Sequence, residues 1–197
     1  MTTRGNRLFL PGMMRAALCG CLLAPFTARA ATWQDDRGLL YAHLEHLHWV
    51  ASGHGPKVLY DFVDPNARSS HTLVLELTPL VARDHLTVRT LLVGYLTKTS
   101  AGKAAAILQA ADPPAALART EAAFTRTQGG AIAPALILPA ARQILQADFR
   151  ALSVLEGNPW MRMAPLLVYR GRRGRVHVFQ GALTPARLTR IIRAAGP

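Results

Sequence analysis

The chain has 197 residues, half of them hydrophobic, and its 23 Lys and Arg residues against 11 Asp and Glu residues give a formal net charge of +12. Both of its cysteines, Cys19 and Cys21, lie within the first thirty residues. If that segment is removed on export, no thiol remains, which excludes structural disulfides, thiolate metal sites and thiol–disulfide chemistry.

The first thirty residues have the pattern of a signal peptide. Three of the first fifteen residues are arginines, residues 16–26 form a short apolar run, and Ala28-Arg29-Ala30 is a small-x-small cleavage site. The run is shorter than the roughly 20 residues that a membrane-spanning helix needs. The sequence therefore predicts a periplasmic protein without stable membrane insertion. An amphipathic N-terminal helix and lipidation at Cys21 remain as alternatives.

The remaining 167 residues suit one compact domain with its own core. They carry 19 basic and 11 acidic side chains, a formal charge of +8. This balance favours acidic partners, anionic membrane surfaces or nucleic acid. Solubility, combined with an arginine-rich coding bias, is the simpler interpretation of the same charge.

Residues 33–50 have leucines at helical spacing and are predicted to form a helix, which Gly and Pro residues at 52–56 end. Three histidines on this helix raise the possibility of a metal site. His43 and His46 share a face, but His48 points elsewhere. A solvated helix face is the better interpretation, and the sequence predicts neither a metal site nor a cofactor.

Residues 58–63 are predicted to be a half-buried strand, because apolar and aromatic residues alternate there. Asp64-Pro65 ends the strand, since proline cannot extend the hydrogen-bonded ladder. After Asn66 the apolar period becomes 3.6, which predicts a helix that ends at about Pro79. The first turn of such a helix exposes backbone N–H groups and favours negative charge, so enzymes place thiolates and phosphates there.

The rest of the chain alternates strands and helices. Residues 86–93 are predicted to form a strand, and 99–108, 113–127 and 140–155 to form helices. Residues 163–169 and 175–179 are predicted to be strands joined by a glycine-containing turn. Thr184-Pro185 starts the final helix, with an N-cap residue followed by proline at the first helical position.

The segment Phe62-Val63-Asp64-Pro65 resembles the active-site segment of the thioredoxin-fold disulfide isomerases of the bacterial periplasm, DsbG and DsbC above all. In that family an apolar strand runs into Phe-x-Asp-Pro-x-Cys-x-x-Cys, and the first cysteine caps the helix. The similarity includes His48-Trp49 upstream and continues through residues 89–94 and 104–108. It covers roughly residue 33 to the C-terminus.

The resemblance implies an α/β, thioredoxin-like fold with a helical insertion at about 99–155. The implied organisation is a signal peptide at 1–30, a linker helix at 31–56 and the thioredoxin-like domain at 57–197. Pro165 matches the cis-proline of the family. The dimerisation domain of the relatives has no counterpart before residue 33, so we expect a monomer.

The two cysteine positions of the family motif fall on Ala67 and Ser70. Disulfide exchange needs an attacking thiolate and a second thiol that resolves the mixed disulfide, and both are absent. The sequence therefore argues against a thiol–disulfide enzyme and predicts a redox-inactive relative. The degenerate motif positions are Ala67, Arg68, Ser69 and Ser70.

Hydrolase chemistry is an alternative, because Ser69, Ser70 and His71 are adjacent and Asp64 is near. Neighbours on a helix point about 100° apart, so a serine and the next histidine rarely meet in the geometry of a triad. No Gly-x-Ser-x-Gly elbow is present either. Helix capping by Asn66 or Ser69 is the simpler interpretation.

The resemblance also implies a surface around the active-site helix and the cis-proline loop that binds unfolded or partly folded chains. Its candidate binding residues are Asn66, Arg68, His71, Ala164 and Pro165. A second candidate is the basic turn at 170–175 together with the arginines of the last helix. No aromatic residues interleave these arginines, so nucleic-acid binding is not indicated. The arginines of the last helix that belong to this second candidate are Arg187, Arg190 and Arg193.

The leading prediction is therefore a periplasmic, redox-inactive binding protein. It would act as a chaperone for unfolded chains or as part of an envelope or secretion assembly. An accessory that presents substrates to a cysteine-bearing partner in thiol–disulfide exchange is the alternative.

Overall fold

The computed structural model describes residues 33–156, 165–181 and 183–197. Five strands form one sheet in the order β1-β3-β2-β4-β5. The pair β2–β3 is parallel, and the other three pairs are antiparallel. The strands are β1 (Val50–Gly53), β2 (Lys57–Val63), β3 (Leu86–Leu92), β4 (Leu166–Arg170) and β5 (Val176–Gln180).

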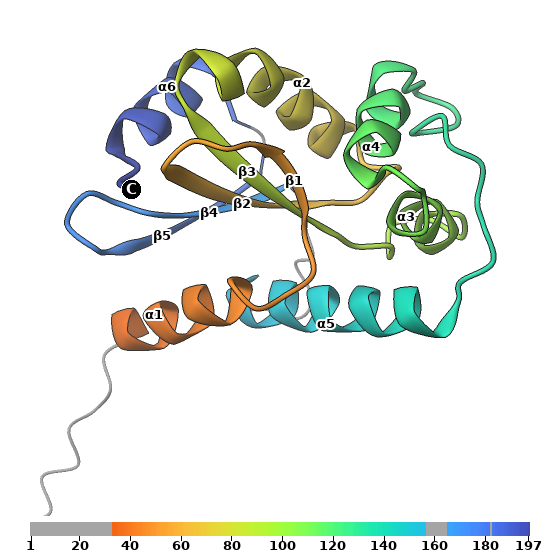
Figure 1. The fold of residues 1–197 in the computed structure, drawn as a ribbon, viewed down its shortest axis with the longest axis horizontal. Coiled ribbons are helices and arrows are strands. Elements are labelled where there is room, and N and C mark those ends of the chain that lie inside the picture. The colour runs from red at the N-terminus through yellow and green to blue at the C-terminus, as the bar shows by residue number, and fades with distance from the viewer. Residues whose placement is uncertain (1–32, 157–164, 182) are drawn as a thin grey trace, which may run out of the picture. The chain divides into compact units, whose positions relative to one another are not determined.

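Helices cover both faces of this sheet (Figure 1). One core lies between the sheet and the pair α2 and α6, and a second core lies between the opposite face and the pair α1 and α5. A third core packs α3 and α4 against the ends of β2 and β3. The helices are α1 (Trp33–Leu44), α2 (Arg68–Arg83), α3 (Ser100–Leu108), α4 (Pro113–Ala122), α5 (Pro139–Glu156) and α6 (Pro185–Ala194).

Strand β2 is central and is buried on both faces. Leu59 packs with α2 and α6, whereas Tyr60 and Phe62 pack with α1 and α5. Every side chain from Leu59 to Val63 is buried, including Asp61. The prediction of a half-buried strand is therefore wrong, because helices on both faces exclude water from both sets of side chains.

The first helix is shorter than predicted, and a strand follows it. Helix α1 ends at Leu44, and a backbone hydrogen bond from His46 N to His43 O closes the turn (3.1 Å). Val50 then begins β1, where it pairs with Thr90 of β3. The guanidinium of Arg89 lies over the Trp49 ring at 4.4 Å, which holds this connection on the sheet.

Proline does not end α2 where the sequence predicted. Pro79 lies inside the helix, which continues to Arg83. The missing N–H costs one helical hydrogen bond, but Leu80 and Val81 beyond it pack against the core and favour continuation. Helix α4 is also shorter than predicted: it ends at Ala122.

The other predicted strands and helices are confirmed to within about three residues. Helix α6 begins as expected, with the Thr184 hydroxyl accepting a hydrogen bond from Arg187 N at 3.4 Å. Among the described residues, no helix combines the length and the apolar character needed to cross a membrane. The predicted signal peptide lies outside the described residues and stays a prediction.

Candidate functional site

The candidate site is the junction between β2 and α2, where the sequence locates the degenerate motif. Ala67 is the N-cap residue of α2, with an extended backbone (φ −84°, ψ 115°), and its side chain makes no capping hydrogen bond. The predicted capping by Asn66 is therefore wrong, because the Asn66 side chain bonds to residues of other segments.

The two positions that carry cysteine in the related motif are both covered. Ala67 is 6% exposed and Ser70 is fully buried, whereas Arg68 between them is exposed. The Ser70 hydroxyl has no hydrogen-bond partner among the described residues. Neither position therefore presents a nucleophile to a substrate.

Asp64 organises the backbone on both sides of the junction. One carboxylate oxygen accepts hydrogen bonds from Asn66 N (2.9 Å) and Ser100 Oγ (2.8 Å). The other accepts from the backbone N–H groups of Tyr95 and Leu96, both at 2.9 Å. The buried charge is thereby satisfied by four donors, which connect the end of β2 to the segment between β3 and α3.

Asn66, a predicted binding residue, is bonded to the start of α3. Its Nδ2 donates to Thr97 Oγ1 (2.7 Å), Thr99 Oγ1 (3.0 Å) and Ser100 Oγ (3.1 Å). Its Oδ1 accepts from Lys103 Nζ at 2.9 Å. The Asn66 amide therefore stabilises the structure of the site, and its nitrogen and oxygen are already hydrogen-bonded within the protein.

Lys103 is the buried cation of this network. Besides Asn66, its ammonium group donates to the carbonyl oxygens of Gln128 and Gly130, the latter at 2.7 Å. Burial lowers the pKa of Lys103, and the nearby charge of Asp64 opposes that shift. Lys103 thus ties the segment after α4 to the start of α2.

Two glycines allow that segment to approach the site closely. Gly130 N donates to Pro65 O at 2.7 Å. Gly129 has φ +70°, and a Cβ atom there would lie 2.1 Å from the side-chain oxygen of Asn66. Glycine is needed at this position both for its backbone conformation and for space.

His71 faces inward, although the sequence placed it on the binding surface. Its ring stacks on Phe124 with the centroids 4.3 Å apart, and its Nδ1 lies 3.1 Å from Glu121 Oε2. Burial, together with Asp61 and Asp64, raises the pKa of Glu121 to about 8. Burial and Arg68 lower the pKa of His71. Both shifts favour a neutral pair at pH 7, in which the Glu121 carboxylic acid donates to Nδ1.

Of the two serines beside His71, Ser70 is buried, and its hydroxyl is not bonded to the imidazole. The Nδ1 of His71 contacts Glu121 instead of Asp64. Glu121 was not predicted from the sequence, because it lies 50 positions from His71 and nothing in the local pattern joins them.

Asp61 is a second acid that the sequence analysis missed. It is fully buried in β2, and neither carboxylate oxygen has a hydrogen-bond partner among the described residues. Burial raises its pKa to about 6, and the Thr90 hydroxyl on β3 opposes the shift. The sequence did contain one signal for Asp61, because an acidic residue within an otherwise apolar strand is unusual.

A groove of about 290 Å³ adjoins the junction. Tyr95, Ile137 and Phe149 line it from three separate segments. Three exposed leucines flank it in the sequence: Leu96 is 51% exposed, Leu136 82% and Leu138 48%. The backbone N–H groups of Tyr95 and Leu96 bond to Asp64, so the segment that carries both residues is attached to the junction.

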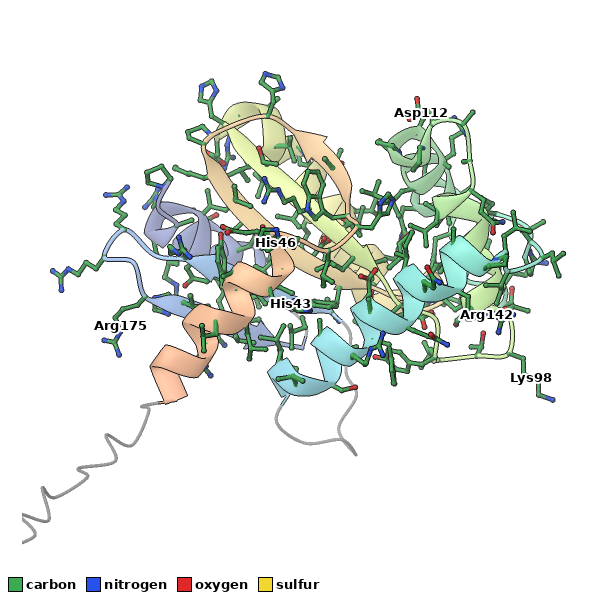
Figure 2. All side chains as sticks on the ribbon, turned by 60° about the horizontal axis from the view of Figure 1, so that its bottom comes forward. His43, His46, Lys98, Asp112, Arg142 and Arg175 are labelled. Carbon is green, nitrogen blue, oxygen red and sulfur yellow. The ribbon has the colours of Figure 1, made fainter. Side chains whose placement is uncertain are left out.

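The remaining predicted residues are placed as follows. Pro165 is buried directly before β4, and its carbonyl accepts from Gly181 N at 3.0 Å. Ala164 lies outside the described residues, so its role and the cis peptide bond stay predictions. His43 and His46 are exposed near the end of α1 (Figure 2). No cluster of His, Cys, Asp and Glu suited to a metal ion occurs among the described residues.

Asp64→Ala is expected to lower the free energy of unfolding by about 3 kcal/mol or more, because four donors lose a buried acceptor. Urea denaturation measures the change. Asp84→Ala is the matched control: Asp84 pairs with Arg83 at 2.7 Å on the surface, and its removal should cost at most about 1 kcal/mol. Equal losses in the two variants would show that the Asp64 network contributes nothing special.

No family model matches the chain. DsbG of Pseudomonas aeruginosa, a thiol:disulfide interchange protein, is 28% identical to it over 156 residues, which are 78% of the chain and 58% of that relative. The chain is therefore similar to the thiol:disulfide interchange proteins of the DsbG/DsbC type, and it spans only 58% of the length of that relative.

Solved structures show that the chain has the thioredoxin-like fold, as the sequence predicted. A linker-deletion variant of ScsC from Proteus mirabilis has a TM-score of 0.61 at 16% identity, covering 80% of the chain and 81% of that structure. A periplasmic thioredoxin-like protein from Salmonella enterica serovar Typhimurium has a TM-score of 0.60 at 14% identity, with coverages of 79% and 94%.

Proposed function

We propose that this DsbG/DsbC-type protein is redox-inactive and works in the periplasm by binding unfolded or partly folded chains. It acts as a chaperone or as the client-binding part of an envelope or secretion assembly. The observation that carries the proposal is the pair Ala67 and Ser70, which stands where the family has its two cysteines.

Redox inactivity follows from the chemistry of exchange. A disulfide exchanger needs a thiolate that attacks and a second thiol that releases the product. Alanine has no heteroatom, and the buried Ser70 hydroxyl forms no disulfide. The described residues contain no cysteine at all.

Binding is supported by the surface beside the site. The groove lined by Tyr95, Ile137 and Phe149 and the exposed Leu96 and Leu136 offer apolar area that a folded monomer rarely exposes without use. Unfolded chains expose apolar side chains of matching character. Arg68, which is exposed in the first turn of α2, adds a positive charge that favours acidic segments.

The periplasmic location is supported by two observations. One solved structure of the same fold is described as a periplasmic thioredoxin-like protein. The first thirty residues also have the basic start, apolar run and small-x-small site of a signal peptide. Detection of a shortened chain in the periplasmic fraction would test the location directly.

The test of the function is suppression of aggregation, with a denatured client that contains no cysteine, so that covalent capture is impossible. The wild type should keep the client soluble. Leu96→Ser with Leu136→Ser should weaken this effect, because the two changes remove exposed apolar area beside the groove. Leu39→Ser is the control, since the exposed fraction of Leu39, 73%, lies between those of Leu96 and Leu136, but Leu39 is on α1. The absence of any effect of wild-type protein would reject the proposal.

Arg68→Glu should separate stability from binding. A carboxylate at the start of α2 interacts favourably with the helix dipole by about 0.3–1 kcal/mol, so the melting temperature should hold or rise. Capture of an acidic client should fall, because the charge at this exposed position is reversed. Calorimetry and the aggregation assay measure the two effects. If Arg172→Glu with Arg173→Glu abolishes capture while Arg68→Glu does not, the inherited surface is not the one that binds clients.

A further inference from the structure

The last 41 residues have a charge pattern that the proposed function does not use. Residues 157–197 contain eight arginines, no lysine and no Asp or Glu. All 11 acidic residues of the chain precede this stretch. Solubility needs charge of either sign, so it does not by itself account for a stretch in which every ionised side chain is a guanidinium.

The fold gathers these arginines on one surface. The turn between β4 and β5 is bonded to the end of α6, since Arg172 N donates to Ala194 O at 3.2 Å and Gly196 N donates to Arg170 O at 2.9 Å. Arginines of the turn therefore lie beside those of the last two turns of the helix. We define the arginine surface as Arg172, Arg173, Arg175, Arg190 and Arg193, all of which are exposed.

The charges of this surface are not neutralised within the described part of the chain. The ion pairs recorded there join His71 to Glu121 and Arg83 to Asp84, and neither involves the arginine surface. Arg170 and Arg187 are excluded from the definition because their guanidinium groups lie over the rings of Tyr41 and Phe179.

The composition of the surface favours an anion over an apolar peptide. The pockets beside α2, α3 and α4 are lined by other residues, and none of the exposed large apolar residues belongs to it. Leu188, Ile191 and Ile192 of α6 are buried in the core, so the helix has no apolar face to insert into lipid. Guanidinium groups bind phosphate oxygens in a bidentate manner, and clustered basic residues attract anionic lipids.

We propose that the arginine surface binds peripherally to an anionic phospholipid surface, through its phosphate groups and without insertion. The binding is electrostatic and therefore decreases with salt. It uses residues separate from the client surface, so it goes beyond the proposed function and does not depend on it.

Strand register gives the bound protein a definite orientation. In the pair β2–β4, Phe62 lies opposite Leu166 and Leu59 lies opposite Tyr169. The arginine turn is therefore at the Lys57 end of β2, and the junction at Asn66 is at the other end. Figure 2 shows Arg175 at one end of the domain and Lys98 at the other. A protein held by its arginines thus points the client groove away from the lipid.

The experiment is co-sedimentation of the full chain with vesicles that contain phosphatidylglycerol, compared with pure phosphatidylcholine vesicles, over a range of salt concentrations. Arg172→Gln with Arg173→Gln should weaken binding to the anionic vesicles at least about tenfold at low salt. Lys98→Gln with Arg142→Gln removes the same charge at the far end (Figure 2) and should have little effect.

The quantity to compare is the affinity of the two double variants for anionic vesicles. Any binding through the first thirty residues is common to both variants and cancels in this comparison. Equal weakening in both variants would overturn the proposal, since only net charge would then matter. The proposal also fails if the wild-type protein binds anionic vesicles no better than neutral ones but does bind polyglutamate. In that case the double variant at Arg172 and Arg173 should have lost polyglutamate binding. That result would identify an acidic protein segment as the partner. Client capture should be unchanged in the arginine variant, so failure here is distinct from failure of the proposed function.

Discussion

Raising the pH from about 5 to about 8 is expected to destabilise the fold, because two buried carboxyl groups keep protons in the folded state that they have lost in the unfolded chain. Burial, with Asp61 and Asp64, raises the pKa of Glu121 to about 8. Burial also raises the pKa of Asp148 to about 8, despite the opposing effect of the Leu92 backbone. Both groups ionise near pH 4 in the unfolded chain.

The direction of the effect follows from proton binding. Between pH 4 and 8 the folded state retains protons on Glu121 and Asp148 that the unfolded state has lost, so stability is full below pH 4 and falls as the pH rises. Asp61, with a pKa of about 6, adds to this loss in the lower part of the range. The lowered pKa of His71 acts in the opposite direction, because its contribution to stability is lost as the pH falls below its unfolded value of about 6.5.

Urea denaturation at several pH values measures the slope, and neutral variants identify its source. Glu121→Gln and Asp148→Asn should each make the free energy of unfolding less dependent on pH, since about one proton fewer is then lost on unfolding. Each should also raise the free energy of unfolding at pH 8. Asp112→Asn is the control, because Asp112 is exposed at the N-cap of α4. A stability that is independent of pH over this range would show that the buried carboxyl groups are already ionised in the fold.

Ala67→Cys together with Ser70→Cys is expected to restore some insulin reduction, with a thiol at the first position, which is 6% exposed, attacking the substrate and a thiol at the buried second position resolving the mixed disulfide. Residues at i and i+3 are neighbours on a helix, and their separation suits a disulfide. Ala67 is the N-cap residue of α2, where the helix dipole lowers the pKa of a thiol. The surrounding Asp64 network holds the backbone of this turn.

The assay requires a background in which Cys19 and Cys21 are replaced by serine, so that only the introduced thiols react. Ala67→Cys alone is the matched control, because it attacks substrates but has no second thiol to release them. If the double variant forms its disulfide and yet stays inactive, substrate access has been lost along with the cysteines. Activity of the cysteine-free wild type would refute redox inactivity.

Local signals made the centre of the fold predictable. The apolar run before Asp64-Pro65 and the helical period after it predict β2 and α2, and Thr184-Pro185 predicts the start of α6. The short strand β1 was not predictable, because four residues carry too little alternation to oppose a helical pattern.

The polar network of the site was largely hidden from the sequence. Asn66 and Lys103 are 37 positions apart, and His71 and Glu121 are 50 positions apart. Only the tertiary fold brings these pairs together, so periodicity and motif spacing contain no trace of them. The same contacts explain why Asn66 and His71, which the sequence offered as binding residues, are bonded inside the protein.

The contact between Gly129 and Asn66 has a consequence for how the sequence can diverge. Irregular segments usually accumulate substitutions and insertions, because few contacts restrain them. The irregular segment that follows α4 is different, because Lys103 and the hydrogen bond from Gly130 to Pro65 fix its end. Relatives that keep this network are free to vary the exposed part of the segment, at Arg126 for example. Gly129 is restricted even if Asn66 changes, because a Cβ atom there would lie 2.8 Å from the backbone Cα of residue 66 and φ is +70°.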